Sequence, residues 1–169
     1  MVNKVALFRK VSFEQFAEDY KNLVVNIPEE MIRDVYDAIT LPKRSTTGSA
    51  GYDFVSPVDF ELNMGQEITI PTGIRAEMTE GWVLMIFPRS GLGFKYEMKL
   101  LNTIGVVDQD YFFSDNEGHI MVKIRNDGYK PMPIQAGDKI VQGVFLPFGV
   151  TMDDDATEVR NGGFGSTGR

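Results

Sequence analysis

Four short apolar runs decide the fold class of this chain: ITI at 68–70, WVLMIF at 82–87, HIMVKI at 119–124 and KIVQGVF at 139–145. Clusters of glycine, proline, asparagine and aspartate separate the runs, a pattern typical of an all-β sandwich or barrel with many short strands. No strand–helix–strand unit recurs, which disfavours a parallel α/β sheet. The sequence from Leu41 onward therefore predicts a mainly β fold.

The N-terminal part predicts two short helices after a strand at 2–11. Ser12 is a candidate N-cap with Gln15 at capping-box spacing. Pro28 suits the first position of a second helix and is followed by two glutamates. We expect segment 12–40 to be a helical insertion in the β-rich chain.

The length and composition fit one globular domain. The chain has 169 residues, and 17 Lys and Arg against 24 Asp and Glu give a formal net charge of -7. Such a charge repels nucleic acid and anionic membranes, so general nucleic-acid binding is excluded. We expect residues 1–158 to form a single domain and the glycine-rich residues 159–169 to form a mobile tail.

The absence of cysteine excludes disulfides, thiolate zinc sites and cysteine nucleophiles. The single histidine, His119, excludes a multi-histidine metal cage and is interpreted as structural or exposed. No apolar run approaches the roughly 20 residues of a membrane span. The first residues also lack the apolar core of a signal peptide, so we expect a cytoplasmic protein without membrane contact.

Five segments carry residues suited to chemistry, although each alone also fits a turn, a hairpin or a disordered tail. They are AGYDF at 50–54, PRSGLG at 88–93, NTIGVVDQDY at 102–111, QAGDKIVQ at 135–142 and VRNGGFGSTGR at 159–169. The second offers a hydroxyl, a cation and backbone amides to one anion.

The third and fifth segments are the most suggestive of the five. Asp108 and Asp110 stand two residues apart on a strand-like stretch, so both would point to one face, where one could polarise water. In the tail, Phe164 could stack on a base while Arg160 and Arg169 bind phosphates.

In this order, the five segments resemble the five motifs of the homotrimeric dUTP pyrophosphatase (dUTPase) family, over roughly residues 41–169. The resemblance implies a β-barrel of jelly-roll character and a homotrimer with shared active sites, in which the tail of one subunit closes the site of another. It implies hydrolysis of dUTP to dUMP and pyrophosphate, with Mg²⁺ bound to the three phosphates.

The resemblance also implies roles for individual residues. Asp108 would be the catalytic carboxylate that activates a water, and Asp53 would hold Mg²⁺ through water. The implied substrate-binding residues are Arg89, Ser90, Gly91 and Gln142 at the phosphates, Asn102, Gly105, Val106, Val107 and Met121 around uracil, Tyr111 against the deoxyribose, and Arg160, Phe164, Gly165, Ser166 and Thr167 from the tail.

Three departures from the family pattern stand out. The sequence FFSDNE separates Tyr111 from Gly118, where the family reaches a glycine within two residues. The tail is one residue shorter between Arg160 and Phe164. The helical segment 12–40 is an addition that could cap the barrel, alter the trimer or bind a partner.

Two alternatives to a simple dUTPase remain at this point. One is a dCTP deaminase-like enzyme, which shares the fold and the nucleotide pocket. The other is a regulatory dUTPase that binds a repressor-type protein partner through segment 12–40 or 112–117.

Overall fold

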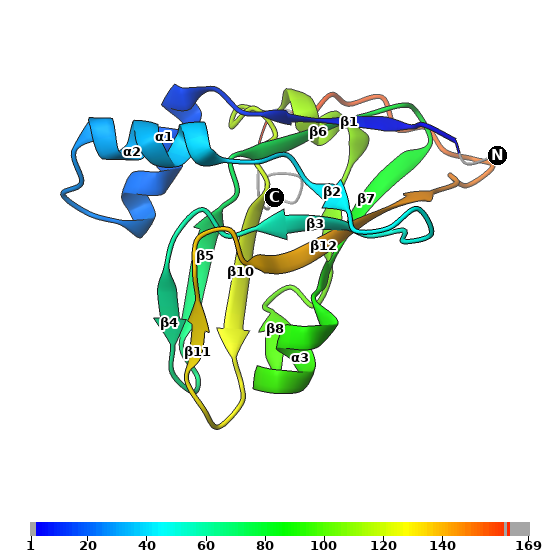
Figure 1. Ribbon diagram of the computed structural model, residues 1–169. Helices are drawn as coiled ribbons and strands as arrows, with labels where there is room; N and C mark the ends of the chain where they lie inside the picture. The colour runs from blue at the N-terminus through cyan, green and yellow to red at the C-terminus, as the bar shows by residue number, and fades with distance from the viewer. Residues whose placement is uncertain (1–2, 161, 163–169) are drawn as a thin grey trace.

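The computed structural model describes residues 3–160 and 162, and it is built mainly from β-strands (Figure 1). The largest sheet has five strands in the order β2, β3, β12, β7 and β9. Their bounds are Lys43–Arg44 for β2, Tyr52–Val55 for β3, Lys139–Pro147 for β12, Trp82–Pro88 for β7 and Gly105–Val107 for β9. All of its pairings are antiparallel.

Three smaller antiparallel ladders complete the described strands. Their orders are β5–β10–β8, β1–β6 and β11–β4. The bounds are Ala6–Lys10 for β1, Phe60–Leu62 for β4, Glu67–Pro71 for β5, Ile74–Met78 for β6, Met98–Leu100 for β8, Met121–Asn126 for β10 and Met132–Ile134 for β11. Three of the four apolar runs fall in β5, β7 and β12, and the run at 119–124 enters β10 at Met121, so the prediction of a mainly β fold is confirmed.

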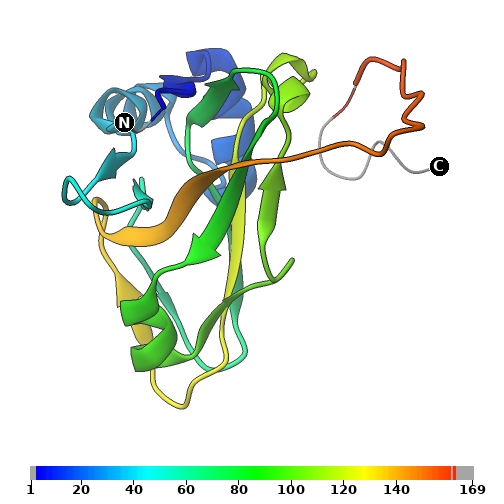
Figure 2. The same cartoon turned by 90° about the vertical axis from the view of Figure 1, so that its right-hand side faces the viewer.

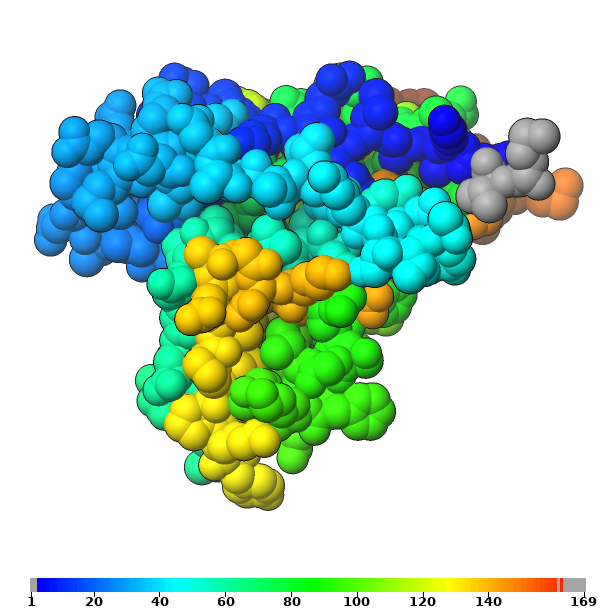
Figure 3. All heavy atoms as spheres, in the orientation of Figure 1, coloured from blue at the N-terminus to red at the C-terminus, as the bar shows by residue number. Residues whose placement is uncertain are grey.

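Both N-terminal helices are present, and they lie together at one end of the molecule (Figures 1 and 3). Helix α1 spans Phe13–Leu23, and the Oγ of its N-cap Ser12 accepts a hydrogen bond from the Gln15 amide at 3.1 Å, as predicted. Helix α2 spans Glu29–Ala38, and Pro28 is its N-cap rather than its first helical residue.

Two helical turns were not expected from the sequence. Helix α3 covers Ser90–Tyr96, where the sequence suggested a turn. The 3-10 helix η1 covers Gln109–Phe113, so the strand expected through Asp108 and Asp110 ends at Val107. The Tyr111 amide donates to the Asp108 carbonyl at 3.2 Å, and this bond turns the backbone away from the sheet.

One apolar core joins the helices to the sheets. Phe16 of α1 and Ile32 of α2 are fully buried together with Ile70 of β5, Leu84 of β7 and Ile124 of β10. Because α1 contributes to this core, segment 12–40 is an integral part of the described structure. In the described part of the chain, no helix has the length and apolar character needed to cross a membrane.

Replacement of Phe16 by alanine tests this shared core. Phe16 has no exposed surface and packs against Tyr20 and Tyr36, with ring centroids 5.3 and 5.7 Å away. We expect Phe16→Ala to lower the free energy of unfolding by about 3–5 kcal/mol, through lost burial and the cavity left behind. Urea denaturation at fixed protein concentration measures this change, with Val25→Ala, at a site 76% exposed, as the control. Equal stability of the two variants would show that the helices are not part of the core.

Candidate functional site

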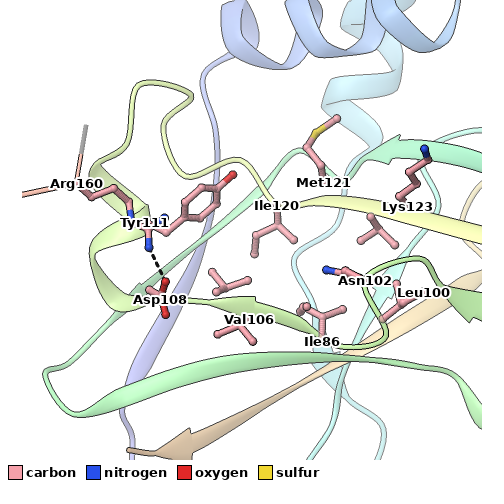
Figure 4. A pocket seen from close by; sticks show the side chains of 13 residues that line it. Ile86, Leu100, Asn102, Val106, Asp108, Tyr111, Ile120, Met121, Lys123 and Arg160 are labelled. Atoms are coloured by element: carbon pink, nitrogen blue, oxygen red, sulfur yellow. Dashed lines mark hydrogen bonds and ion pairs between the residues drawn. The ribbon is translucent and has the colours of Figure 1, made fainter. Parts of the chain in front are cut away.

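A pocket of about 160 Å³ lies between β9, η1 and the start of β10 (Figure 4). We call it the β9–β10 pocket. Its lining includes most of the predicted base-recognition residues together with the predicted catalytic aspartate. The full lining is Ile86, Leu100, Asn102, Gly105, Val106, Val107, Asp108, Tyr111, Ile120, Met121, Val122, Lys123 and Arg160.

Strand β9 supplies backbone to one wall of this pocket. It is the edge strand of the five-stranded sheet and pairs with β7 through Gly105, Val106 and Val107. An edge strand has a row of amides and carbonyls that point away from its one partner strand. At Gly105, an added Cβ would stand 3.0 Å from the Ile86 Cβ, so glycine permits the close packing of β9 on β7.

Tyr111 is held firmly at the wall of the pocket. Its side chain is buried, its hydroxyl donates to the His119 carbonyl at 2.7 Å, and the Asn116 side-chain amide donates to that hydroxyl at 2.8 Å. Burial raises the pKa of the Tyr111 phenol, so the hydroxyl remains a hydrogen-bond donor at neutral pH. The ring is therefore fixed by contacts outside the pocket.

Two carboxylates and one guanidinium meet at the mouth of the pocket. Arg160 Nη2 lies 2.5 Å from Asp108 Oδ2, and Arg160 Nε lies 2.9 Å from Asp110 Oδ1. The Asp108 and Asp110 side chains remain about half exposed. The chain after β12 runs away from the sheets (Figure 2), and Arg160 nonetheless lines the pocket. Asp108 and Asp110 thus share one cation although they do not lie on a strand.

A second cluster combines three of the predicted segments. Gln142 of β12 is paired with Asp53 of β3 on one side and with Phe87 of β7 on the other, which brings Arg89 close to Asp53. Asp53 is only 6% exposed, and its carboxylate binds the Arg89 guanidinium through Oδ1. Its Oδ2 accepts from Ser45 Oγ at 2.8 Å and lies 2.7 Å from Lys139 Nζ.

The charge balance of this cluster favours an ionised Asp53. Burial alone would raise its pKa, but the hydrogen bonds from Lys139 and Ser45 and the charge of Arg89 outweigh burial, so the pKa lies below its ordinary value. Two cations then face one carboxylate. The cluster keeps a net positive charge that suits an anionic ligand.

Arg89 and Lys139 also line a second hollow of about 370 Å³, with Gly91 and Lys95. Ser90 is exposed beside it at the start of α3. The Gln142 side-chain amide donates to the Pro88 carbonyl at 3.3 Å, and a Cβ on Gly51 would stand 2.5 Å from Gln142 Oε1. Gly51 therefore leaves the space that Gln142 occupies.

The predicted site residues thus form two groups within this chain. The β9–β10 pocket and the Arg89–Lys139 hollow have no lining residue in common. Four predicted tail residues, Phe164, Gly165, Ser166 and Thr167, lie outside the described residues. Within one chain, the two groups are therefore lined by different residues.

Sequence reasoning missed several residues that support these groups. Lys139 stands three positions before Gln142 on one strand, and Ser45 lies in the KRST stretch, yet no pattern linked either residue to Asp53. His119 was interpreted as structural or exposed, and the structure buries it completely. Asn116 belongs to the FFSDNE insertion and binds Tyr111.

The described residues offer no preformed cluster of metal-binding side chains. No group of three or more His, Cys, Asp or Glu side chains that could hold a metal ion occurs in ranges 3–160 and 162. Both oxygens of Asp53 are taken by Arg89, Ser45 and Lys139, and two adjacent cations oppose a further cation. Direct ligation of Mg²⁺ by Asp53 does not fit this arrangement, and its predicted role in holding Mg²⁺ through water stays a prediction.

Comparison with known proteins relates the chain to one family. The dUTPase family model matches residues 37–168. A deoxyuridine 5'-triphosphate nucleotidohydrolase of Lactococcus lactis subsp. lactis (strain IL1403) is 44% identical over 133 residues, which are 77% of this chain and 89% of that protein.

Solved structures agree with this assignment. The crystal structure of the dUTPase from Streptococcus mutans superposes with a TM-score of 0.63 at 34% identity, over 85% of this chain and 97% of that chain. A mutant dUTPase from phage phi11 of S. aureus, described with a structural Mg(II) ion, shares the fold with a TM-score of 0.62 at 19% identity, over 92% of this chain and 98% of that chain. The fold expected from the sequence is confirmed, and this chain belongs to the dUTPase family.

Proposed function

We propose that the chain hydrolyses dUTP to dUMP and pyrophosphate. One observation carries this proposal: in a member of the dUTPase family, the β9–β10 pocket places Asp108 at the mouth of a cavity walled by an edge strand. A carboxylate at this position can take a proton from a water beside the α-phosphorus of a nucleotide whose base lies in the pocket.

The pocket offers the groups that uracil recognition requires. The edge-strand backbone around Val106 can form the hydrogen bonds that a pairing base would form, and Asn102 stands opposite Met121 on the facing wall (Figure 4). A site that hydrogen-bonds the polar edge of one base strongly rejects a base with a different pattern. We assign discrimination of uracil from cytosine to these backbone groups and exclusion of a 5-methyl group to the narrowness of the pocket.

Tyr111 is suited to recognise the sugar. Its ring lines the pocket, and two hydrogen bonds on its hydroxyl fix the position of that ring. A ring held this rigidly against a deoxyribose would clash with a 2′-hydroxyl. We therefore propose that Tyr111 disfavours UTP.

The reaction step is an in-line displacement. A water oxygen forms a bond to the α-phosphorus while the bond from that phosphorus to the bridging oxygen breaks, and the electron pair leaves with pyrophosphate. Asp108 takes the proton released by the water. Its half-exposed side chain lets both water and phosphate reach it.

The cluster around Arg89 and Gln142 would bind the triphosphate. Because it and the β9–β10 pocket are separate within one chain, we propose that the cluster of one subunit faces the pocket of another in a homotrimer. Mg²⁺ would enter with the triphosphate and offset its charge, since it retains several waters and binds through phosphate oxygens.

Release of pyrophosphate from dUTP by the purified protein tests this proposal. Ammonia release from dCTP would instead support the deaminase-like alternative. The repressor-type partner stays a prediction. Because segment 12–40 contributes to the core, pull-down with the full chain and with a variant changed only at an exposed position of that segment, such as Met31→Ala, would test it.

A further inference from the structure

Helix α1 contacts a loop that adjoins the β9–β10 pocket and contributes Ile120 to its lining. This loop, residues 114–120, joins η1 to β10 and contains most of the sequence inserted after Tyr111. Its residues Glu117 and His119 both bind α1 or its N-cap. Two of the three departures from the family pattern, the helical segment and the longer loop, are thus in direct contact.

The first contact is at the N-terminus of α1. The Ser12 amide donates to Glu117 Oε2 at 2.8 Å, and Ser12 Oγ donates to Glu117 Oε1 at 2.5 Å. Arg75 lies 3.6 Å from Glu117 and donates to the Phe112 carbonyl at 2.6 Å. Burial would raise the pKa of Glu117, but the two bonds from Ser12 and the charge of Arg75 outweigh it, so Glu117 is ionised near neutral pH.

The second contact is a buried hydrogen-bonded chain. His119 has no exposed surface, its Nδ1 lies 2.5 Å from Asp19 Oδ2, and the Gly73 amide donates to its Nε2 at 2.8 Å. Because Nε2 accepts a hydrogen bond, the ring proton is on Nδ1 and is donated to Asp19. Gln15 donates to the same Asp19 oxygen at 2.9 Å.

The series of hydrogen bonds from Asp19 through His119 ends at the β9–β10 pocket. The His119 carbonyl accepts the Tyr111 hydroxyl proton, and the Tyr111 ring lines the β9–β10 pocket. The His119 amide also donates to the Asn116 carbonyl at 3.0 Å, while the Asn116 side chain donates to Tyr111. A shift of His119 would therefore move both hydrogen-bond partners of the Tyr111 hydroxyl.

We infer that α1 is a positioning element of the nucleotide site, and that Asp19 and His119 are positioning residues which fix Tyr111 against the sugar. The inference rests on the proposed role of Tyr111. Asp19 orients the imidazole, the imidazole fixes the backbone of residue 119, and that backbone fixes the phenol. Without the Asp19 bond, Tyr111 would yield to a 2′-hydroxyl, so discrimination between dUTP and UTP would fall.

The ratio of kcat/KM for dUTP to kcat/KM for UTP measures this effect, because a loss of folded protein lowers both constants equally. We expect Asp19→Ala to reduce the ratio roughly tenfold, a size typical of coupled neighbouring residues. Asp19→Asn should keep the ratio within about threefold, since its amide oxygen still accepts the Nδ1 proton. Glu18→Ala is the matched control, because it removes an exposed carboxylate from the same helix.

Two variants of His119 distinguish the hydrogen bond at Nδ1 from the hydrogen bond at Nε2. Gln places an acceptor near Nε2 and Asn places a donor near Nδ1, so His119→Gln keeps the Gly73 bond and His119→Asn keeps the Asp19 bond. We expect His119→Gln to lower the ratio of kcat/KM values as Asp19→Ala does. If Asp19→Ala does not fold, His119→Gln tests the inference in its place. In a Tyr111→Phe background, Asp19→Ala should not lower the ratio further.

The outcomes distinguish this inference from the proposed function. A wild-type protein that does not hydrolyse dUTP, or does not prefer it to UTP, overturns the proposed function before any variant is compared. If the wild type prefers dUTP and folded Asp19→Ala and His119→Gln keep the wild-type ratio, the positioning role of α1 is wrong.

Discussion

Asp108→Asn is expected to lower kcat for dUTP hydrolysis by about a thousandfold, within the usual range for loss of a general base. The amide has nearly the shape of the carboxylate but cannot take the proton of the attacking water. Asp108 follows the last residue of β9, and its extended backbone (φ -72°, ψ 157°) starts η1 without a side-chain cap bond. Because the side chain has no capping role, its replacement should leave the fold unchanged.

Steady-state release of pyrophosphate measures this loss, and Asp110→Asn is its control. Asp110 binds the same Arg160 and is equally exposed, so its amide variant removes a similar charge from the same place. We expect Asp110→Asn to retain at least about a tenth of the wild-type kcat, because only Asp108 is assigned to proton transfer. A fully active Asp108→Asn protein would refute the assignment.

Removal of residues 160–169 is expected to lower kcat/KM for dUTP by about a hundredfold or more, the size of effect that lost positioning produces. Arg160 lines the pocket and contacts Asp108, so the tail starts at the proposed reaction centre. The residues beyond it combine glycines with Phe164, Ser166 and Thr167, which suit closure over a base and phosphates.

The truncated protein should otherwise behave like the full chain. Residues 150–159, immediately before the deletion, are mostly exposed and outside the apolar core, so the urea midpoint and the oligomeric state should not change. Glu158→Gln, an exposed change just before the deletion, controls for a change to this stretch of chain that leaves the tail in place, and it should leave kcat/KM unchanged. An unchanged rate after truncation would show that the tail does not close the site.

The parts of the fold that depend on local pattern could be predicted from the sequence. Apolar runs bounded by turn residues give strands, and the Ser12 cap with the apolar face Phe13, Phe16, Ala17 and Tyr20 gives α1. Helix α3 could not be predicted, because the two glycines of SGLGFKY disfavour an isolated helix. Glu97, with a positive φ of 53°, ends that helix.

The candidate site was predictable where its residues are close in sequence. Six residues of the segment from Asn102 to Tyr111 line one pocket, and their role in binding uracil stays a prediction. Contacts between distant residues were not predictable: His119 binds Asp19, which is 100 positions away, and Lys139 binds Ser45, which is 94 positions away. A lone histidine in an apolar run gives no sign of such a partner until the fold brings the two together.

The central claim is tested most directly by pyrophosphate release from a panel of dUTP, UTP, dTTP and dCTP at equal concentration with Mg²⁺ present. The account predicts rapid release from dUTP and scarcely any from the other three, because backbone groups select uracil, the narrow pocket excludes the methyl group and Tyr111 excludes the 2′-hydroxyl. Comparable release from all four nucleotides, or none from dUTP, would contradict it.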